Sequence, residues 1–231
     1  MSLSLLTTEI NRLKNPTKAK VYQWFFKTGP GQYREGDVFL GVTNPHLRRL
    51  VKFYWDTITI KDIQELLNSP YHEYRLIALL IMVKQYPKNT QPIFNLYLAN
   101  TKRINNWDLV DLSARDIVGA YCYEQKDSST IKKLSQSTSL WEKRISMIST
   151  FYYLKNHHFD LSFEVINTLI SDPHDLIHKA IGWTLREIGK KDLPVLLTFL
   201  DQHTLSLPRT ALRYAIEKLP EPQRLYYLKL R

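Results

Sequence analysis

Apolar residues recur three and four positions apart along most of the chain, and this spacing is typical of amphipathic helices. Ser, Thr, Asp or Asn precedes these segments, and Pro or Gly follows many of them, as at the starts and ends of helices. The alternation of apolar and polar residues that marks a strand is nearly absent. The pattern predicts an all-α protein with helices at about 43–55, 69–87, 106–123, 139–155, 160–170, 174–188, 193–200 and 208–219.

The predicted helices repeat in pairs with a period of about 35 residues. A leucine near the end of one helix is followed nine or ten positions later by a polar residue in the next. Arg75 and Arg144 lie 69 positions apart, Arg144 and Lys179 lie 35 apart, and Asp111 falls between the first two. Stacked helix pairs of this length form an α-solenoid whose second helices line a concave face. We therefore predict one domain over residues 1–231, a solenoid of about six helix pairs in which these four side chains share a concave basic groove.

The charge of the chain indicates a polyanionic partner. It has 32 basic and 22 acidic residues, a net charge of +10. The excess lies at the two ends: residues 1–60 hold nine basic and four acidic side chains, residues 61–174 hold thirteen and twelve, and residues 175–231 hold ten and six. Nucleic acid and acidic membranes both attract such a chain. Its 44% of hydrophobic side chains is that of an ordinary soluble, folded protein.

Several kinds of site are excluded by the residues present. The chain contains neither of the common glycine-rich nucleotide-binding motifs, no H-E-x-x-H and no G-x-S-x-G. His157 and His158 are adjacent, so their rings point to different sides of a helix, and no cysteine or nearby acid completes a metal site. Segment 28–37 holds three of the seven glycines but lacks a following lysine that would bind phosphate, so we predict only an irregular turn. We expect no metal and no cofactor.

Cysteine usage and hydropathy indicate the compartment. Cys122 is the single cysteine, which excludes an internal disulfide and favours a reducing environment. The first ten residues lack the basic start and long apolar core of a signal peptide. No apolar run approaches the ~20 residues that span a membrane. We expect a cytoplasmic protein without a membrane partner.

One segment places a carboxylate beside an indole. Trp107 and Asp111 are four residues apart, so they are neighbours on the helix predicted at 106–123. The buried stripe of that helix runs from Val110 through positions 114 and 117 to 121, which puts Asp111 at its edge and facing the groove. A functional Trp–Asp pair fits this pattern, and so does a surface ion pair of Asp111 with Arg115 beside a core tryptophan.

A second segment flanks an aromatic residue with cations. Lys179 precedes Trp183 by one helical turn and Arg186 follows it by one, an arrangement suited to a sugar-phosphate backbone. Gly182 costs about 1 kcal/mol relative to alanine within a helix, so close helix packing or close approach of a ligand must compensate. Packing of Gly182 and Trp183 between repeats is the alternative to a binding role. Arg144 opens another helix and is a third candidate, with a surface arginine–glutamate pair as the alternative.

Three longer motifs stand in order along the chain: Asn106-Trp107-Asp108-Leu109-Val110-Asp111, Trp141-Glu142-Lys143-Arg144 and Lys179-Ala180-Ile181-Gly182-Trp183-Thr184-Leu185-Arg186-Glu187. In this order and spacing they resemble the DNA alkylation repair family, the AlkD-type alkylpurine DNA glycosylases. The stretch 25–42 and the segments around Arg209 and Arg213 add to the likeness, which extends over essentially the whole chain. The resemblance implies that the helix pairs are HEAT-like.

The resemblance also implies roles for single residues. Asp111 would be the catalytic carboxylate, Trp107 and Trp183 would contact the deoxyribose of the lesion, and Arg144 would hold nearby phosphate. The further cations expected to bind DNA are Lys179, Arg186, Arg75, Arg209 and Arg213. Some members carry a second tryptophan where this chain has Asn106, which puts a peripheral DNA contact in doubt.

These residue types suit the chemistry of the family. A purine alkylated at N3 or N7 is cationic and leaves as a neutral base, so its departure needs no general acid. Positive charge develops on the sugar as the C1′–N bond breaks, and a fixed anion and indole faces stabilise that charge. We predict a monomeric, cytoplasmic hydrolase that works on double-stranded DNA in base excision repair and is associated with the nucleoid while doing so.

Two alternatives belong to other classes of protein. A non-catalytic DNA-binding paralogue would keep the basic groove but would have lost Asp111 or a groove tryptophan. A protein-binding helical scaffold has no need for an acid, an arginine and two indoles on one surface. The fold alone does not distinguish these classes.

Overall fold

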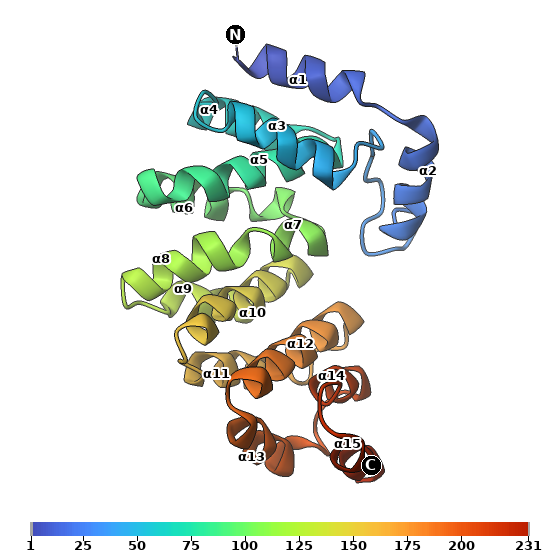
Figure 1. Ribbon diagram of the computed structural model, residues 1–231, viewed down its shortest axis with the longest axis vertical. Coiled ribbons are helices and arrows are strands. Elements are labelled where there is room, and N and C mark those ends of the chain that lie inside the picture. The colour runs from blue at the N-terminus through green and yellow to red at the C-terminus, as the bar shows by residue number, and fades with distance from the viewer. Residues whose placement is uncertain (1, 231) are drawn as a thin grey trace. The chain divides into compact units, whose positions relative to one another are not determined.

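The computed structural model describes residues 2–230 and is built of helices (Figure 1). The α-helices are α1 (Ser2–Arg12), α2 (Pro16–Phe25), α3 (Asn44–Tyr54), α4 (Ile60–Asn68), α5 (His72–Gln85), α6 (Thr90–Ala99), α7 (Trp107–Asp111), α8 (Ala120–Glu124), α9 (Ser129–Ser135), α10 (Leu140–Lys155), α11 (Asp160–Leu169), α12 (Asp175–Lys191), α13 (Leu193–His203), α14 (Arg209–Ala215) and α15 (Glu221–Lys229). Over the described residues there is an isolated bridge between Val38 and Tyr71 but no strand. The predicted all-α class is confirmed.

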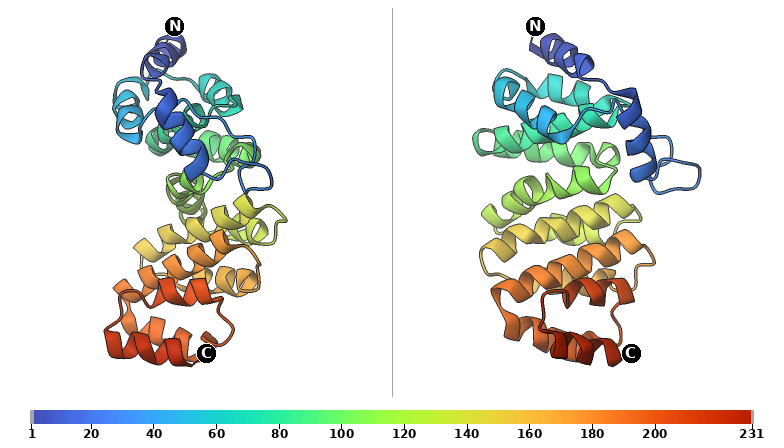
Figure 2. Two further views of the ribbon diagram at one scale, coloured as in Figure 1. Left: turned by 90° about the vertical axis from the view of Figure 1, so that its right-hand side faces the viewer. Right: turned by 45° about the vertical axis from the view of Figure 1, so that its right-hand side comes forward.

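The chain forms two compact units of helices. The single repeat domain over residues 1–231 stays a prediction. The N-terminal unit is Met1–Ser113 and the C-terminal unit is Ala114–Arg231. In the N-terminal unit, α5 packs against α3, α4 and α7. In the C-terminal unit, α10, α12 and α14 lie side by side (Figure 2). No helix in the described part of the chain has the length and apolar character that a membrane span requires.

The core of the N-terminal unit is built around α5. Residues 76–82 of this helix are all buried, whichever side of the helix they occupy. A helix that is hydrophobic on all sides belongs in the interior of a protein. Its first turn is different, because His72, Glu73 and Arg75 are buried there as well. Burial of an ionisable side chain is unfavourable unless it is paired, so each of the three needs a partner inside the unit.

Three of the repeat positions fall at equivalent places in long helices. Arg75, Arg144 and Lys179 lie in the first two turns of α5, α10 and α12, as the period of about 35 residues predicts. Their exposure differs, however. Arg75 is 2% and Arg144 5% exposed, whereas 40% of the Lys179 side chain is exposed. Equivalent positions in the sequence repeat therefore do not give equally accessible cations.

The helix predicted at 106–123 is interrupted, so that prediction was wrong in its middle. α7 ends at Asp111, and a π-helical turn, η3 (Arg115–Gly119), precedes α8. The Oγ of Ser113 donates to the carbonyl oxygen four residues before it (2.6 Å) and competes with the backbone for that acceptor. Asp111 is therefore the last residue of a short helix instead of the middle of a long one.

Gly182 lies where α12 and α14 come closest. A Cβ at this position would lie 2.4 Å from the carbonyl oxygen of Ala211 and 2.5 Å from the Cβ of Tyr214. Close helix packing, the first of the two explanations that the sequence left open, therefore accounts for the glycine.

Gly182→Ala should lower the free energy of unfolding by about 2–3 kcal/mol, because the atoms it would meet belong to the backbone of α14 and to a Cβ, which cannot move independently. Denaturant unfolding measures this loss. Gly189→Ala is the control, since a Cβ there meets only the side chain of Leu196, which can change rotamer. A loss for Gly182→Ala no larger than that of the control would contradict the packing argument.

Candidate functional site

The short helix α7 carries the first predicted pair of functional residues. Asn106 caps it, because its Oδ1 accepts a hydrogen bond from the backbone N–H of Trp107 (2.8 Å). Leu109 and Val110 are fully buried and anchor the helix in the N-terminal unit. Trp107 and Asp111 are both half-buried. The partly exposed side of α7 therefore presents an indole and a carboxylate four residues apart.

The structure bears on two alternatives that the sequence left open here. Asn106 is 0% exposed, so the residue at the departure from the family pattern is an internal helix cap and not a surface contact. Arg115 forms a bidentate ion pair with Asp116, with both N···O distances 2.8 Å. The strong carboxylate partner of Arg115 is therefore Asp116, which the sequence analysis had not considered.

Trp107 borders an aromatic cavity of the N-terminal unit. Its indole stacks on Phe26, with ring centroids 5.4 Å apart and 28° between the planes, and meets Phe25 edge-on at 6.1 Å. The cavity has a volume of about 440 Å³, and α2 contributes the side chains of Val21 and Trp24 to its lining. Trp24 is 73% exposed, which is unusual for so large an apolar side chain. The sequence analysis missed this cavity because its two halves are far apart along the chain.

Five ionisable side chains form a network beside this cavity. His72 lies between two carboxylates: its Nδ1 is 3.2 Å from Oδ2 of Asp37, and its Nε2 is 2.8 Å from Oδ2 of Asp108. Arg75 pairs with the other oxygen of Asp37, and Arg34 donates to Asp37 through Nε (3.0 Å). Asp37 ends the glycine-containing loop 28–37. The network therefore connects that loop to α5 and, through Asp108, to α7.

Opposing effects set the pKa values in this network. Burial alone lowers the pKa of His72, but the charge of Asp108 and its hydrogen bond, followed by those of Asp37, outweigh burial and raise that pKa to about 9. Burial alone raises the pKa of Asp37, but the hydrogen bond from His72 and the charge of Arg75 outweigh it and hold that pKa below its usual range. At neutral pH an imidazolium therefore lies between two carboxylates.

The structure places Arg75, one of the predicted DNA-binding residues, in the interior of the N-terminal unit. Its side chain is 2% exposed and is paired with Asp37, and its Nη1 donates to Oδ1 of Asn105 (3.2 Å). Burial lowers the pKa of Arg75, and the charge of Asp37 offsets this only in part. The guanidinium neutralises a buried carboxylate inside the N-terminal unit. The periodicity of the sequence could not indicate this, because the partner lies in a loop outside the repeats.

Glu73 fixes the segment 40–42, which follows the loop 28–37, to α5. Its Oε1 accepts hydrogen bonds from the backbone N–H groups of Gly41 (2.8 Å) and Val42 (3.2 Å), and its Oε2 accepts one from Leu40 (2.9 Å). Gly41 has a φ of 80°, and a Cβ there would lie 2.0 Å from the carbonyl oxygen of Asn15. The sequence analysis missed Glu73. The signal was present, since three ionisable residues stand in the first turn of an otherwise apolar helix.

The second predicted aromatic residue lies on α12 in the C-terminal unit. Trp183 is half-buried, meets the ring of Phe151 at 4.7 Å and donates from Nε1 to Oε1 of Glu187 (3.2 Å). Lys179, one turn earlier, pairs with Asp175 at 2.8 Å, and both side chains are partly exposed. Exposed ion pairs of this kind contribute little to stability and exchange partners easily. This segment therefore keeps a partly exposed indole and an accessible ammonium group one turn apart.

The four arginines predicted to bind DNA from this unit differ in accessibility. Arg144 is 5% exposed, and its Nη1 donates to a carbonyl oxygen in the first turn of α12 (2.6 Å), which links α10 to α12. Arg186 pairs with Glu217, and Arg209 donates to a carbonyl oxygen of α15 (3.2 Å). Arg213 is exposed. Arg144 is therefore mainly an internal brace, and its predicted contact with phosphate stays a prediction. Arg213 is the most accessible arginine of the set.

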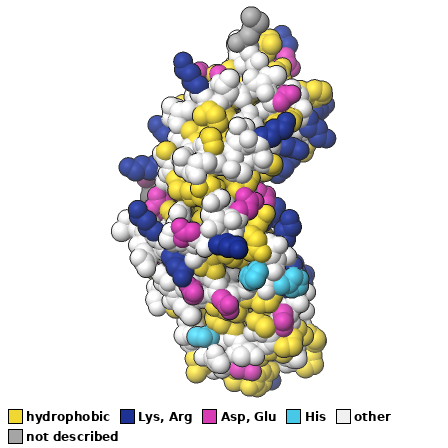
Figure 3. All heavy atoms as spheres, turned by 90° about the vertical axis from the view of Figure 1, so that its left-hand side faces the viewer, with side chains coloured by type: hydrophobic (Ala, Val, Ile, Leu, Met, Phe, Trp, Pro, Cys, Tyr) yellow, Lys and Arg dark blue, Asp and Glu magenta, His cyan; other side chains and the backbone are white. Residues whose placement is uncertain are grey.

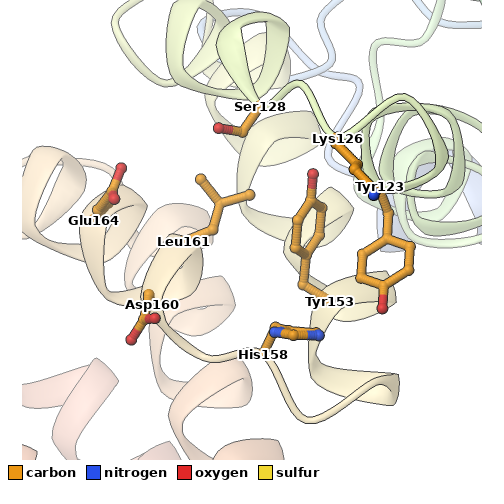
Figure 4. Close-up of a pocket in the computed structure, with 8 residues that line it drawn as sticks. All are labelled: Tyr123, Lys126, Ser128, Tyr153, His158, Asp160, Leu161 and Glu164. Atoms are coloured by element: carbon orange, nitrogen blue, oxygen red, sulfur yellow. The ribbon is translucent and has the colours of Figure 1, made fainter.

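A second cavity, of about 450 Å³, lies in the C-terminal unit near the ends of α8 and α10 (Figure 4). The rings of Tyr123, Tyr153 and His158 face it, and Asp160 and Glu164 border it from α11 (Figure 4). None of the residues predicted for catalysis or DNA binding lines this cavity. In the described residues no cluster of three His, Cys, Asp or Glu side chains could hold a metal ion.

The surface carries charges of both signs. On the face drawn in Figure 3, lysine and arginine side chains are interspersed with aspartate and glutamate, and apolar patches lie between them. Many of the cations described above are already paired with carboxylates. Phosphate groups of a polyanion would compete with those carboxylates, which makes binding dependent on salt.

Comparison with known proteins gives the fold class first and then the family. A solved structure, "Predicted DNA alkylation repair enzyme from Enterococcus faecalis", shares this all-helical fold with a TM-score of 0.73 at 18% sequence identity, over 90% of this chain and 97% of that chain. A family model described as "DNA alkylation repair enzyme" matches residues 6–219. The chain therefore belongs to the DNA alkylation repair enzyme family. No curated protein matches it.

Proposed function

We propose that the protein is a DNA glycosylase that hydrolyses the N-glycosidic bond of cationic N3- or N7-alkylated purines in duplex DNA. Family membership supports a role in alkylation repair. The main support for glycosylase activity in particular is the partly exposed side of α7, where Trp107 and Asp111 lie one helical turn apart. The product is a free purine base and an abasic site. The reaction needs neither metal nor cofactor.

The carboxylate of Asp111 has two tasks in this proposal. A purine alkylated at N3 or N7 already carries the positive charge that makes it a good leaving group. The barrier then lies in the oxocarbenium character that develops at C1′ of the sugar. A fixed anion stabilises that charge most strongly where water is scarce, and Asp111 also accepts a proton from the attacking water.

The resemblance to the family implies that the indoles also act on the cationic sugar. Trp107 presents its ring from α7, and its orientation is set by stacking on Phe26 at 5.4 Å. Trp183 is oriented by Phe151 and Glu187 in the C-terminal unit. The negative face of an aromatic ring attracts a cation by about 0.5–2 kcal/mol, depending on how dry the site is. We propose that both rings contact deoxyribose at the lesion.

The cations of the C-terminal unit hold the phosphate backbone. Lys179 and Arg213 are the accessible members, and Arg186 and Arg209 become available where phosphate replaces their present partners. Arg144 acts mainly by bracing α10 against α12, and its contact with phosphate stays a prediction from the resemblance. We propose that these groups act on a concave face of HEAT-like repeats and that the enzyme works as a monomer.

The proposal is tested by product analysis. The protein is incubated with a duplex that contains one 7-methylguanine and with the same duplex containing guanine. We expect free 7-methylguanine and an alkali-labile abasic site at the lesion, and no cleavage of the undamaged duplex. A protein that binds both duplexes with steep salt dependence and releases no base would be the non-catalytic paralogue. Weak binding that ignores salt would favour the protein-binding scaffold.

A further inference from the structure

The loop 28–37 and the buried side chains around it have no part in the proposed reaction. The loop contains Gly31 and Gly36, both with positive φ, and ends at Asp37, whose side chain is fully buried. The ring of His72 lies between that carboxylate and the carboxylate of Asp108. Asp108 directly follows Trp107 in the first turn of α7. The loop is thus connected through one imidazole ring to the helix that carries the proposed active site.

We propose that His72 is a positioning residue, which as an imidazolium donating to Asp37 and Asp108 fixes α7 and thereby the indole of Trp107 and the carboxylate of Asp111. The loop 28–37 has the function of delivering Asp37 to this ring. The inference rests on the proposed function for its effect on the reaction, and on the geometry alone for its effect on α7.

The hydrogen-bond geometry requires the protonated ring. Both nitrogens of His72 face a carboxylate oxygen, at 3.2 Å to Asp37 and 2.8 Å to Asp108. An imidazolium donates from both nitrogens, but a neutral imidazole donates from only one. Loss of the proton therefore places a lone pair against one of the two carboxylates. That contact changes from attractive to repulsive, and the tie between the loop and α7 is lost.

The rings around His72 also favour the cation. Phe39 stacks on its ring with centroids 4.6 Å apart and 25° between the planes, and Phe26 lies at 5.1 Å with 31°. Aromatic faces attract a cation at such distances. Phe26 in turn stacks on Trp107, so the imidazole, the phenyl ring and the indole pack against one another in sequence. The orientation of Trp107 is therefore coupled to His72 through both Asp108 and Phe26.

The charges that face His72 come from three segments. The loop contributes Asp37, with Arg34 behind it, α7 contributes Asp108, and α5 itself contributes Arg75. Burial lowers the pKa of His72, and the two carboxylates outweigh it and raise the pKa to about 9. His72 is then almost fully protonated at neutral pH and loses its proton as the pH rises through about 9.

The test compares wild type with His72→Gln, in which the amide can donate to one carboxylate but carries no charge. Three quantities are measured: the single-turnover rate of 7-methylguanine release from pH 6.5 to 10, corrected for uncatalysed loss; the dissociation constant for the duplex; and hydrogen exchange of the peptide spanning 105–113. His158→Gln is the matched control, because His158 is exposed and lies outside the proposed site.

For wild type and the control we expect a rate of base release that falls as the pH passes about 9. Above that pH the protection of residues 105–113 against hydrogen exchange, corrected for the base-catalysed rise of the intrinsic exchange rate, should fall as well. His72→Gln should react roughly tenfold more slowly at pH 7.5, because a small misplacement of reacting groups is costly in rate. The dissociation constant of this variant for the duplex should change less than about threefold. Its rate of base release should show no fall near pH 9. The amides of α7 should exchange faster than in wild type at every pH.

A second variant keeps the test decisive where His72→Gln does not fold. Asp108→Asn removes one of the two charges that keep His72 protonated, and the Asp108 side chain is 12% exposed, so the change is tolerated better. The fall in rate should then move to lower pH. An unchanged pH profile in Asp108→Asn, or a His72→Gln protein with the rate, pH profile and exchange of wild type, would overturn the inference.

The failure of this inference differs from the failure of the proposed function. If wild type releases base and His72→Gln behaves identically, the positioning role is wrong and the glycosylase stands. If wild type releases no base but His72→Gln loosens residues 105–113, the glycosylase is wrong and the tie between His72 and α7 stands.

Discussion

Asp111→Asn should lower the single-turnover rate of 7-methylguanine release by roughly 100-fold or more, because loss of one fixed electrostatic group at a developing charge has an effect of that size in other enzymes. The amide keeps the shape of the carboxylate but neither stabilises the oxocarbenium ion nor accepts the proton of the attacking water. The dissociation constant for the damaged duplex should stay within about threefold, since the group acts in the transition state. Single-turnover release and fluorescence anisotropy measure the two quantities.

Asp116→Asn is the matched control for this variant. Asp116 is a half-buried aspartate five positions further on, and its carboxylate already forms a bidentate pair with Arg115. We expect it to retain the wild-type rate within about twofold, because exposed pairs contribute little. Equal base release by wild type and Asp111→Asn would remove Asp111 from the mechanism.

Glu73→Ala should lower the free energy of unfolding of the N-terminal unit by on the order of 3 kcal/mol or more, because three buried backbone N–H groups lose their acceptor together. These donors are those of Leu40, Gly41 and Val42. The chain after the loop would then lose its attachment to α5. Urea unfolding followed by circular dichroism measures the loss.

Glu35→Ala provides the comparison. Glu35 also accepts a backbone hydrogen bond, from Gly31 (2.9 Å), but on the surface, where water can replace it. We expect a loss below about 1 kcal/mol. If both variants unfold at the same urea concentration, the three hydrogen bonds to Glu73 do not hold this part of the chain.

The helices could be predicted because each buries one face. Burial of one face places apolar residues three and four positions apart in the sequence. The helices near α3, α10, α11 and α12 begin and end within a few residues of the predicted positions. The break after Asp111 could not be predicted in this way, since positions 110, 114 and 117 keep helical spacing across it. A single hydroxyl, that of Ser113, and a widened turn account for the difference.

The accessibility of the candidate side chains could be predicted where one motif holds them together, but not where a distant partner decides it. Trp107 and Asp111 come from one helical turn, and the structure places both on its partly exposed side. Arg75 has the same place in the repeat as Lys179, but Asp37 draws it into the interior. Such pairing across the fold leaves no local pattern. His72 was missed for the same reason.

The proposed glycosylase acts on purines that are already cationic and so needs no general acid. The most direct measurement is base release from two matched duplexes, one with 7-methylguanine and one with hypoxanthine, a neutral purine lesion, at the same position. We expect release of 7-methylguanine and none of hypoxanthine above the uncatalysed level. Equal release of both bases, or release of hypoxanthine alone, would contradict it.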